Sequence, residues 1–230
     1  DGDGGDGGGA LPPGTGPEVC NVQTLEVAPV PLKRLTSLQY INTLRDLVGA
    51  PDFEAEIDDT DGRITERIVR QYRDAAEALT ERRDEWQREV FPCDLTAGED
   101  LGCLDNFIQG FGSRAFRRPP TQAEEQFLKD AFAVATSKSL SFEDAMLVVF
   151  EMMLQSPALV YLHEVGKPNA TDSLRLLSDH EVASRLSYFV WDTMPDDELL
   201  AAAAAGELGT QEGLSEQVER MLVDERAEST

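Results

Sequence analysis

The apolar residues of this chain recur mainly every three or four positions, which is the spacing of amphipathic helices. In the clearest stretch, Leu104, Phe107, Ile108, Phe111 and Ala115 form one apolar stripe that runs into Phe116 and the sequence Arg-Arg-Pro-Pro at 117–120. Proline cannot continue a helix, so we expect a turn at this point. No alternating strand pattern is visible. We therefore predict an all-α fold, an irregular bundle of about seven to eight helices.

Helix boundaries are marked by side chains that cap exposed backbone groups. Capping boxes begin at Thr36, Thr121 and Ser178, each followed three residues later by Gln or Glu, and Ser141 is a further cap. We expect helices after each of these residues, and further helices at 64–87, 103–115, before Gly206 and at 211–223. Segment 27–35 should be extended, and segment 158–165 should form an extended piece or one helical turn.

The predicted buried faces follow from the same periodicity. Residues expected to face the core include Ile64, Val69, Phe127, Phe189, Leu214, Val218 and Leu222, together with Trp191 at the end of its helix.

Composition divides the chain into four regions. Residues 1–30 are rich in Gly, Asp and Pro and predict a flexible acidic linker. Residues 31–92 should form an N-terminal helical pair, and 93–172 a central helical module containing the Arg-Arg-Pro-Pro junction. Residues 173–230 should form a C-terminal helical module that we expect to be truncated. An acidic, Gly-rich start of this kind follows the lipidated cysteine in many bacterial lipoproteins, so a lipid tether is one hypothesis.

The charge of the chain limits its partners. Lys and Arg number 20 against 44 Asp and Glu, a formal net charge of −24. This balance argues against a nucleic-acid backbone or an anionic membrane surface as the main partner, so membrane contact is expected only through an N-terminal lipid. The sequence also contains no apolar run of the roughly 18 residues that a membrane-spanning helix needs.

Two of the three cysteines, Cys93 and Cys103, flank a short acidic loop and are expected to form a disulfide. Closing such a loop stabilises a fold by roughly 2.5–3 kcal/mol in the chain-entropy treatment. A metal site is the competing interpretation, but two thiolates provide only half of a ligand set. Cys20 is left over. A disulfide is compatible with an oxidising compartment.

The arginines around the junction are the candidate site. Arg114, Arg117, Arg118 and the mid-helix Arg185 could bind an anion, or they could form internal ion pairs; for Arg117 or Arg118 we expect the 196–198 cluster or Glu181 as partner. Tyr188 and Trp191 could stack on a ligand, although core packing also explains them. Carboxylates such as Glu164 and Glu181 could serve glycoside chemistry, but helix capping also explains Glu181. The two histidines, His163 and His180, are isolated in the sequence and predict no metal site.

Three blocks of sequence carry a family resemblance, and they lie at 31–49, at 107–119 continuing through 154–157, and at 177–199. The chain resembles a family of uncharacterised helical modules in secreted, multi-domain proteins of planctomycetes and myxobacteria. Proteins of that family continue into further modules, one of them with a Cys-x-x-Cys-His haem motif, and are often joined to cytochrome c domains. The resemblance provides no catalytic residues.

Three functional hypotheses follow. By resemblance, this is a non-catalytic region of an exported, periplasmic or cell-surface protein, without a cofactor in this chain and with c-type haem in downstream modules of the same protein. The alternatives are part of the substrate or haem pocket of a periplasmic haem oxidoreductase, and a surface module that binds a polysaccharide or a protein.

Overall fold

The structure is a computed structural model that describes residues 32–59, 64–98, 100–167 and 175–229. The chain divides into two units, 1–30 and 31–230, and the description below concerns the second unit. The predicted linker at 1–30 and Cys20 lie outside the described residues.

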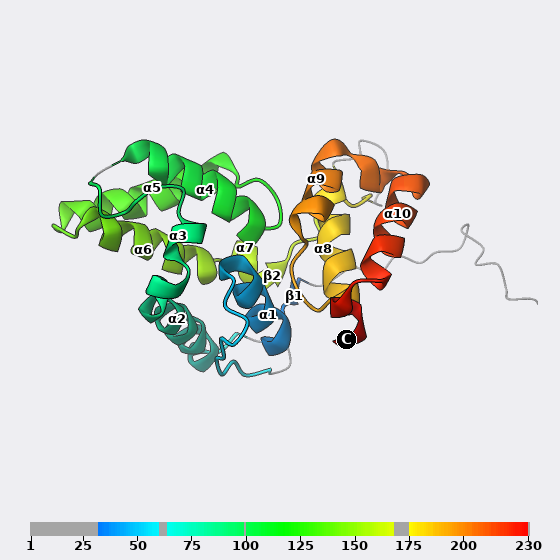
Figure 1. The fold of residues 1–230 in the computed structure, drawn as a ribbon, viewed down its shortest axis with the longest axis horizontal. Coiled ribbons are helices and arrows are strands. Elements are labelled where there is room, and N and C mark those ends of the chain that lie inside the picture. Colours follow the sequence, from blue (N-terminus) through cyan, green and yellow to red (C-terminus); the bar gives the residue numbers. More distant parts are fainter. Residues whose placement is uncertain (1–31, 60–63, 99, 168–174, 230) are drawn as a thin grey trace, which may run out of the picture. The chain divides into compact units, whose positions relative to one another are not determined.

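The first half of the described chain contains five α-helices. They are α1 (Ser37–Val48), α2 (Glu66–Glu81), α3 (Gln87–Val90), α4 (Leu101–Ala115) and α5 (Gln122–Ser137), with a short 3₁₀ turn, η2, at Arg83–Glu85 (Figure 1). The capping boxes at Thr36 and Thr121 are both present, each with the side chain of the third helical residue returning to the backbone of the cap. Asp100 caps α4 by accepting from the amides of Gly102 and Cys103.

The second half is also helical. It contains α6 (Phe142–Leu154), α7 (Pro157–Val160), α8 (Asp179–Val190), α9 (Asp197–Ala205) and α10 (Gln211–Leu222), and the 3₁₀ segments η3 (Glu207–Gly209) and η4 (Glu225–Ser229). The third capping box, at Ser178, opens α8 as predicted. With eight helices of nine or more residues in the described ranges, the prediction of an all-α bundle is confirmed.

Two strands of two residues each depart from the purely helical expectation. Strand β1 (Lys33–Arg34) pairs antiparallel with β2 (Tyr161–Leu162), with Lys33 opposite Leu162. A pairing this short leaves no period of two to detect in the sequence. The 158–165 segment therefore forms both predicted alternatives in succession, first the helical turn α7 and then an extended strand.

The helix predicted at 64–87 is wrong in its length, because α2 ends at Glu81. Trp86 is 2% exposed, and its indole N–H donates to the carbonyl of Leu79. The chain leaves the helix at Arg82 and reaches buried Trp86 through the 3₁₀ turn η2. Ile64 and Val69 were expected to be buried but are exposed, while the small Ala75 and Ala76 lie on the packed face.

A large core holds most of the buried side chains of α1 to α7. At its centre Trp86 stacks on Phe150 with ring centroids 4.6 Å apart, and Phe91 lies 4.5 Å from Phe107. Aromatic contacts at these distances each add about 0.5–1.5 kcal/mol beyond burial. Helices α5 and α6 run side by side along this core.

The predicted disulfide between Cys93 and Cys103 is confirmed, with Cα atoms 5.8 Å apart. It joins the loop after Phe91 to the first turn of α4. Because Phe91 and Phe107 pack against each other, the covalent bond fixes a contact that the core already makes.

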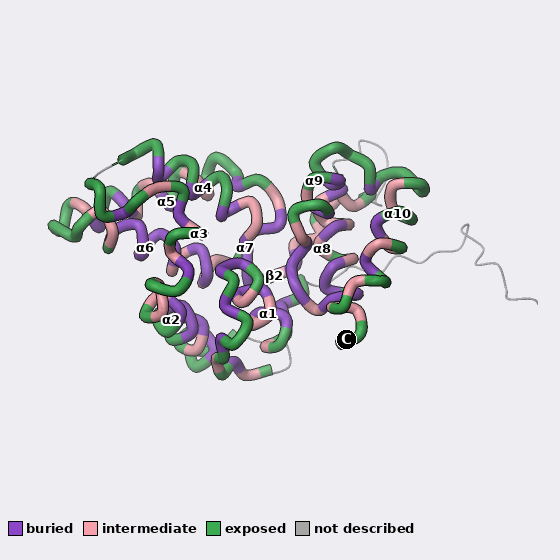
Figure 2. Tube along the Cα trace, viewed as in Figure 1, coloured by how far each residue is buried: buried purple, intermediate pink, exposed green. Residues whose placement is uncertain are grey.

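A small core joins α8, α9, η3 and α10 around Ala183, Trp191, Leu199 and Met221. Helix α8 serves both cores, because Tyr188 is buried in the large one. Figure 2 shows buried and exposed positions following each other along this helix.

Several predicted core positions are wrong. Phe127, Phe189 and Leu222 are exposed, and Leu214 and Val218 are half-buried. The buried face of α8 follows Ala183, Ser187 and Val190, which rotates Phe189 outward. The buried face of α8 holds the small residues Ala183 and Ser187 beside Tyr188, so apolar size alone did not mark this face.

Candidate functional site

Arg117 follows the last turn of α4 and is the most deeply buried charged residue of the junction, at 2% exposure. Its φ is 58°, a left-handed conformation in which glycine is the usual residue. A non-glycine residue pays about 1–2 kcal/mol for such a conformation, so side-chain interactions must hold it there.

The guanidinium of Arg117 donates five hydrogen bonds to neutral oxygens. The acceptors are the carbonyls of Ala115 (3.3 Å), Ala158 (2.9 Å), Leu159 (3.0 Å) and Tyr161 (2.9 Å), and the hydroxyl of Tyr188 (3.3 Å). Three of these carbonyls belong to the end of α7 and the residue after it, where helix carbonyls carry partial negative charge. Its charged carbon also lies 5.5 Å from the centroid of the Tyr188 ring.

The acidic partners expected for Arg117 are therefore wrong. Among the described residues, none of its hydrogen bonds goes to a carboxylate. Asp196 instead accepts from Arg220 at 2.7 and 3.0 Å, and Glu181 accepts from the amides of Val165 and Gly166. A cluster of helix-end carbonyls therefore offsets the buried positive charge of Arg117, the role that we expected carboxylates to play.

Arg118 does form an ion pair, but with Glu124 on the first turn of α5. Its two terminal nitrogens donate to the two carboxylate oxygens at 2.9 and 2.8 Å. This hydrogen-bonded pair lowers the pKa of Glu124 to about 2. Glu124 also accepts from the backbone amide of Thr121 at 2.7 Å, so the pair reinforces the capping box.

The other two candidate arginines lie apart from this junction. Arg114 donates to the carbonyls of Asp46 (3.1 Å) and Leu47 at the end of α1, and its Nε lies 3.5 Å from a carboxylate oxygen of Asp197. Arg185 pairs with Glu164, with Nε 2.8 Å from the carboxylate. The four arginines thus make four separate sets of contacts.

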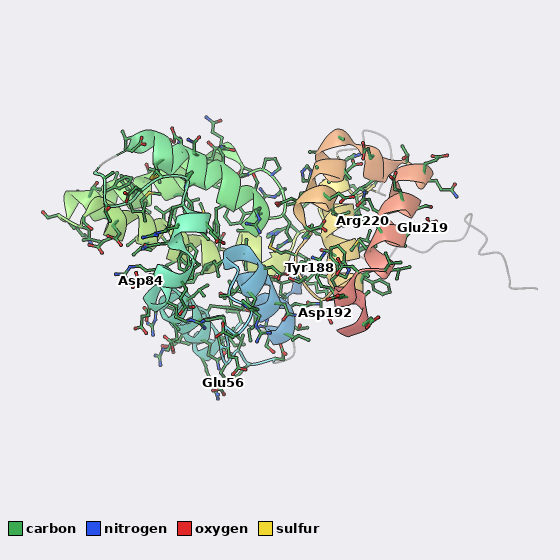
Figure 3. The ribbon with its side chains drawn as sticks, in the orientation of Figure 1. Glu56, Asp84, Tyr188, Asp192, Glu219 and Arg220 are labelled. Carbon is green, nitrogen blue, oxygen red and sulfur yellow. A yellow bond between two sulfur atoms is a disulfide. The ribbon has the colours of Figure 1, made fainter. Side chains whose placement is uncertain are left out.

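A polar seam joins α1 to the turn between α8 and α9 (Figure 3). Gln39 donates to the Asp192 carboxylate at 2.9 Å, the hydroxyls of Thr43 and Tyr188 are 2.7 Å apart, and Thr193 donates to Asp46 at 2.6 Å. Because Tyr188 also accepts from Arg117, the seam connects α1, α4, α7 and α8 in one network.

Trp191 follows the end of α8 and is buried as expected. Its indole N–H donates to the carbonyl of Met221 at 3.0 Å, and the guanidinium of Arg226 lies 3.6 Å from the ring centroid. Asp196 accepts from Arg226 as well as from Arg220. These contacts explain Trp191 as a core residue of the small core.

A cleft of about 230 Å³ lies beside the arginine junction. The turn from α4 to α5, the segment after β2 and the first turns of α8 line it, with side chains that are mostly polar: Phe116, Arg117, Arg118, Thr121, His163, Val165, Ser178, His180, Glu181 and Ser184. Both histidines of the chain thus face one cleft, which we did not predict.

The environment keeps both imidazoles uncharged near neutral pH. Burial lowers the pKa of His163, and the charges of Arg118 and Arg117 lower it further. Burial also lowers the pKa of His180, while nearby Asp179 opposes the shift. The two rings are 17 positions apart in the sequence with no shared motif, so no sequence signal could have paired them.

The hydroxyls of Thr121 and Ser178 donate to Glu124 and Glu181, and the guanidinium of Arg117 donates to internal oxygens. The polar groups that this cleft offers to a ligand are therefore the two imidazoles, the Ser184 hydroxyl and the Nε of Arg118. Within the described ranges, no group of three or more His, Cys, Asp or Glu side chains is placed to hold a metal ion. In the same residues, no helix has the length and apolar character needed to cross a membrane.

Comparison with known proteins gives two family matches. Residues 103–164 match PSD5, a protein family of unknown function (DUF1595), and residues 177–230 match PSD4, a protein family of unknown function (DUF1592). No curated protein and no solved structure matches the chain. The expected resemblance to helical modules of unknown function is thereby confirmed, and the two matched segments are those that Arg117 and Tyr188 join.

Proposed function

We propose that this chain is a non-catalytic helical region of an exported protein whose chemistry lies in other modules of the same polypeptide. In this proposal a lipid on the N-terminal linker tethers the protein, and cytochrome c modules downstream carry the haem. The partners of the region are those downstream modules.

The observation that carries the proposal is the polar joint around Arg117. Its five hydrogen bonds connect α4 and α7, in the segment that matches one family, to α8, in the segment that matches the other. Arg118 and Arg114 are likewise engaged by internal partners. Arginines with internal partners hold helical segments in fixed positions relative to each other, as a scaffold does.

Export is supported by the Cys93–Cys103 disulfide. Disulfides persist in oxidising compartments and are rare where thiols are kept reduced. The lipid tether is supported by the composition of residues 1–16, which are almost entirely Gly, Asp and Pro.

The test is cell fractionation of the native protein, with thiol trapping before lysis and mass spectrometry of the mature N-terminus. We expect an oxidised Cys93–Cys103 pair in an exported fraction and a lipid on the first residue of the mature protein. Reduced cysteines in a cytoplasmic fraction would contradict export, and an unmodified mature N-terminus would contradict the tether.

A second candidate function is part of the substrate or haem pocket of a haem oxidoreductase. The observation in its favour is the convergence of His163 and His180 on one cleft. A haem titration followed at the Soret band, on this chain and on the full-length protein, separates the two candidates. A Soret shift that His163→Ala and His180→Ala both abolish would favour the pocket, and its absence from this chain would favour the scaffold.

A further inference from the structure

The cleft beside the junction gathers cationic side chains in a strongly acidic chain. Its lining contributes two guanidinium groups and one carboxylate, that of Glu181. That carboxylate already accepts from the amides of Val165 (2.6 Å), Gly166 (2.9 Å) and Ser178 (2.6 Å), and from the Ser178 hydroxyl (2.8 Å). Four donors satisfy most of its hydrogen-bonding capacity, so Glu181 offers little to a ligand except its charge.

Several donors of the lining are not engaged by the protein. Arg118 uses its two terminal nitrogens for Glu124 and for the carbonyl of Pro119, and its Nε makes no hydrogen bond within the described residues. In the same residues, no hydrogen bond engages the side chains of His180 or Ser184. These groups come from the α4–α5 turn and from α8, and all of them line the cleft.

The volume and the lining of the cleft limit the class of ligand that it can hold. At about 230 Å³ it is smaller than the roughly 300–1,000 Å³ of sites for drug-sized molecules. Phe116 and Val165 supply an apolar wall, and Ser184 supplies a hydroxyl, whereas the hydroxyls of Thr121 and Ser178 donate to Glu124 and Glu181. Such walls suit a compact molecule that carries both an anionic group and hydroxyl groups.

We propose that this cleft binds a small hydroxycarboxylic acid of the size of a hexuronate, with its carboxylate held by the Nε of Arg118 and the imidazoles of His163 and His180. A ligand hydroxyl bonds to the side chain of Ser184. A guanidinium and imidazole donors recognise carboxylates through charge-assisted hydrogen bonds, which are about twice as strong as neutral ones. The site lies between the two family segments, a place where ligand clefts commonly form.

Binding at this site is coupled to protonation of the imidazoles. The charged groups that face them are Arg117, Arg118 and Glu181 in the lining, with Glu124 and Asp179 behind it. The arginines and burial keep both rings neutral when the cleft is free, and a bound carboxylate favours their protonated forms. Affinity therefore rises as the pH falls below the ordinary pKa of histidine.

Isothermal titration of the full chain with D-glucuronate, D-glucose and inorganic phosphate tests this proposal. We expect glucuronate to bind about tenfold more tightly at pH 5.5 than at pH 7.5, and D-glucose, a neutral sugar of similar size, not to bind. Absence of glucuronate binding at pH 5.5, equal binding of D-glucose, or tighter binding of phosphate would each overturn the proposal.

Substitutions of the two cleft histidines test whether glucuronate binds in this cleft. His163→Asn and His180→Asn each lose one charged donor and should weaken glucuronate binding at pH 5.5 by about tenfold, the size of one charge-assisted hydrogen bond. Arg73→Gln removes a positive charge from the exposed face of α2, where Arg73 contacts Asp74, and should leave affinity unchanged. Equal losses in all three variants, or none in the histidine variants, would contradict this site, and urea midpoints confirm that each variant is folded.

Discussion

Replacement of Arg117 by Ala should destabilise the fold strongly, although the residue touches no carboxylate. The substitution removes the donor shared by the carbonyls of Ala158, Leu159 and Tyr161 and by the Tyr188 hydroxyl. Hydrogen bonds to a charged group contribute about 1.5–3 kcal/mol each. Burying a guanidinium costs several kcal/mol, which offsets part of that sum. We therefore expect a net loss of about 3 kcal/mol.

The assay is equilibrium unfolding in urea at neutral pH. With an m-value of about 2–3 kcal/mol/M, a loss of about 3 kcal/mol lowers the midpoint by roughly 1–1.5 M. The matched control is Arg118→Ala, which removes a partly exposed ion pair and should cost about 1 kcal/mol or less. A loss below 1 kcal/mol for Arg117→Ala would refute the role of Arg117 as the joint.

A second substitution at position 117 separates the contribution of the side chain to the free energy of unfolding from that of the backbone conformation. Arg117→Gly loses the same hydrogen bonds as Arg117→Ala but relieves the left-handed φ of 58°. Glycine adopts that conformation without strain, whereas alanine retains a cost of about 1 kcal/mol. The glycine variant should therefore be the more stable of the two by about 1 kcal/mol, and the reverse order would show that position 117 is not left-handed in solution.

Three further outcomes are expected. The double variant Cys93→Ser/Cys103→Ser should lose roughly 2.5–3 kcal/mol in urea unfolding, and reductant should lower the wild-type midpoint but not that of the variant. The pKa of Glu124 is about 2 in the folded protein, against an ordinary value of 4.5. Its carboxylate therefore stabilises the fold fully above pH 4.5, and this contribution is lost as the pH falls toward 2. Glu124→Gln should flatten the dependence of stability on pH between 4.5 and 2, and an unchanged dependence would count against the Arg118 pair. Asp196→Ala removes the cap of α9 and the partner of Arg220 and should cost about 2 kcal/mol in thermal unfolding, whereas a cost near zero would mean that these contacts are screened.

The local architecture was readable from sequence because its causes are local. The capping boxes at Thr36, Thr121 and Ser178 each depend on two residues three positions apart, and all three open helices in the structure. The same is true of the disulfide, whose cysteines are ten positions apart.

The joint and the cleft were less accessible because their causes are distant in sequence. The sequence pointed to Arg117 but not to its acceptors, four of which lie 41 to 71 positions away. A buried cation satisfied by helix-end carbonyls has no sequence signature, while a nearby acidic cluster does. Likewise, Phe127 and Phe189 are apolar and helical in spacing, yet they are exposed, because the direction of each buried face depends on which helices pack together.

We infer that the joint around Arg117 makes the large and small cores one cooperative unit, and the two tryptophans allow a direct test. Trp86 lies in the large core, stacked on Phe150, and Trp191 lies in the small core. Protein labelled with 5-fluorotryptophan gives one ¹⁹F resonance for each, assigned with Trp86→Phe and Trp191→Phe. In a urea titration of the labelled wild-type chain, both resonances should lose their folded signal at the same midpoint. Separate midpoints for the two tryptophans would contradict the account.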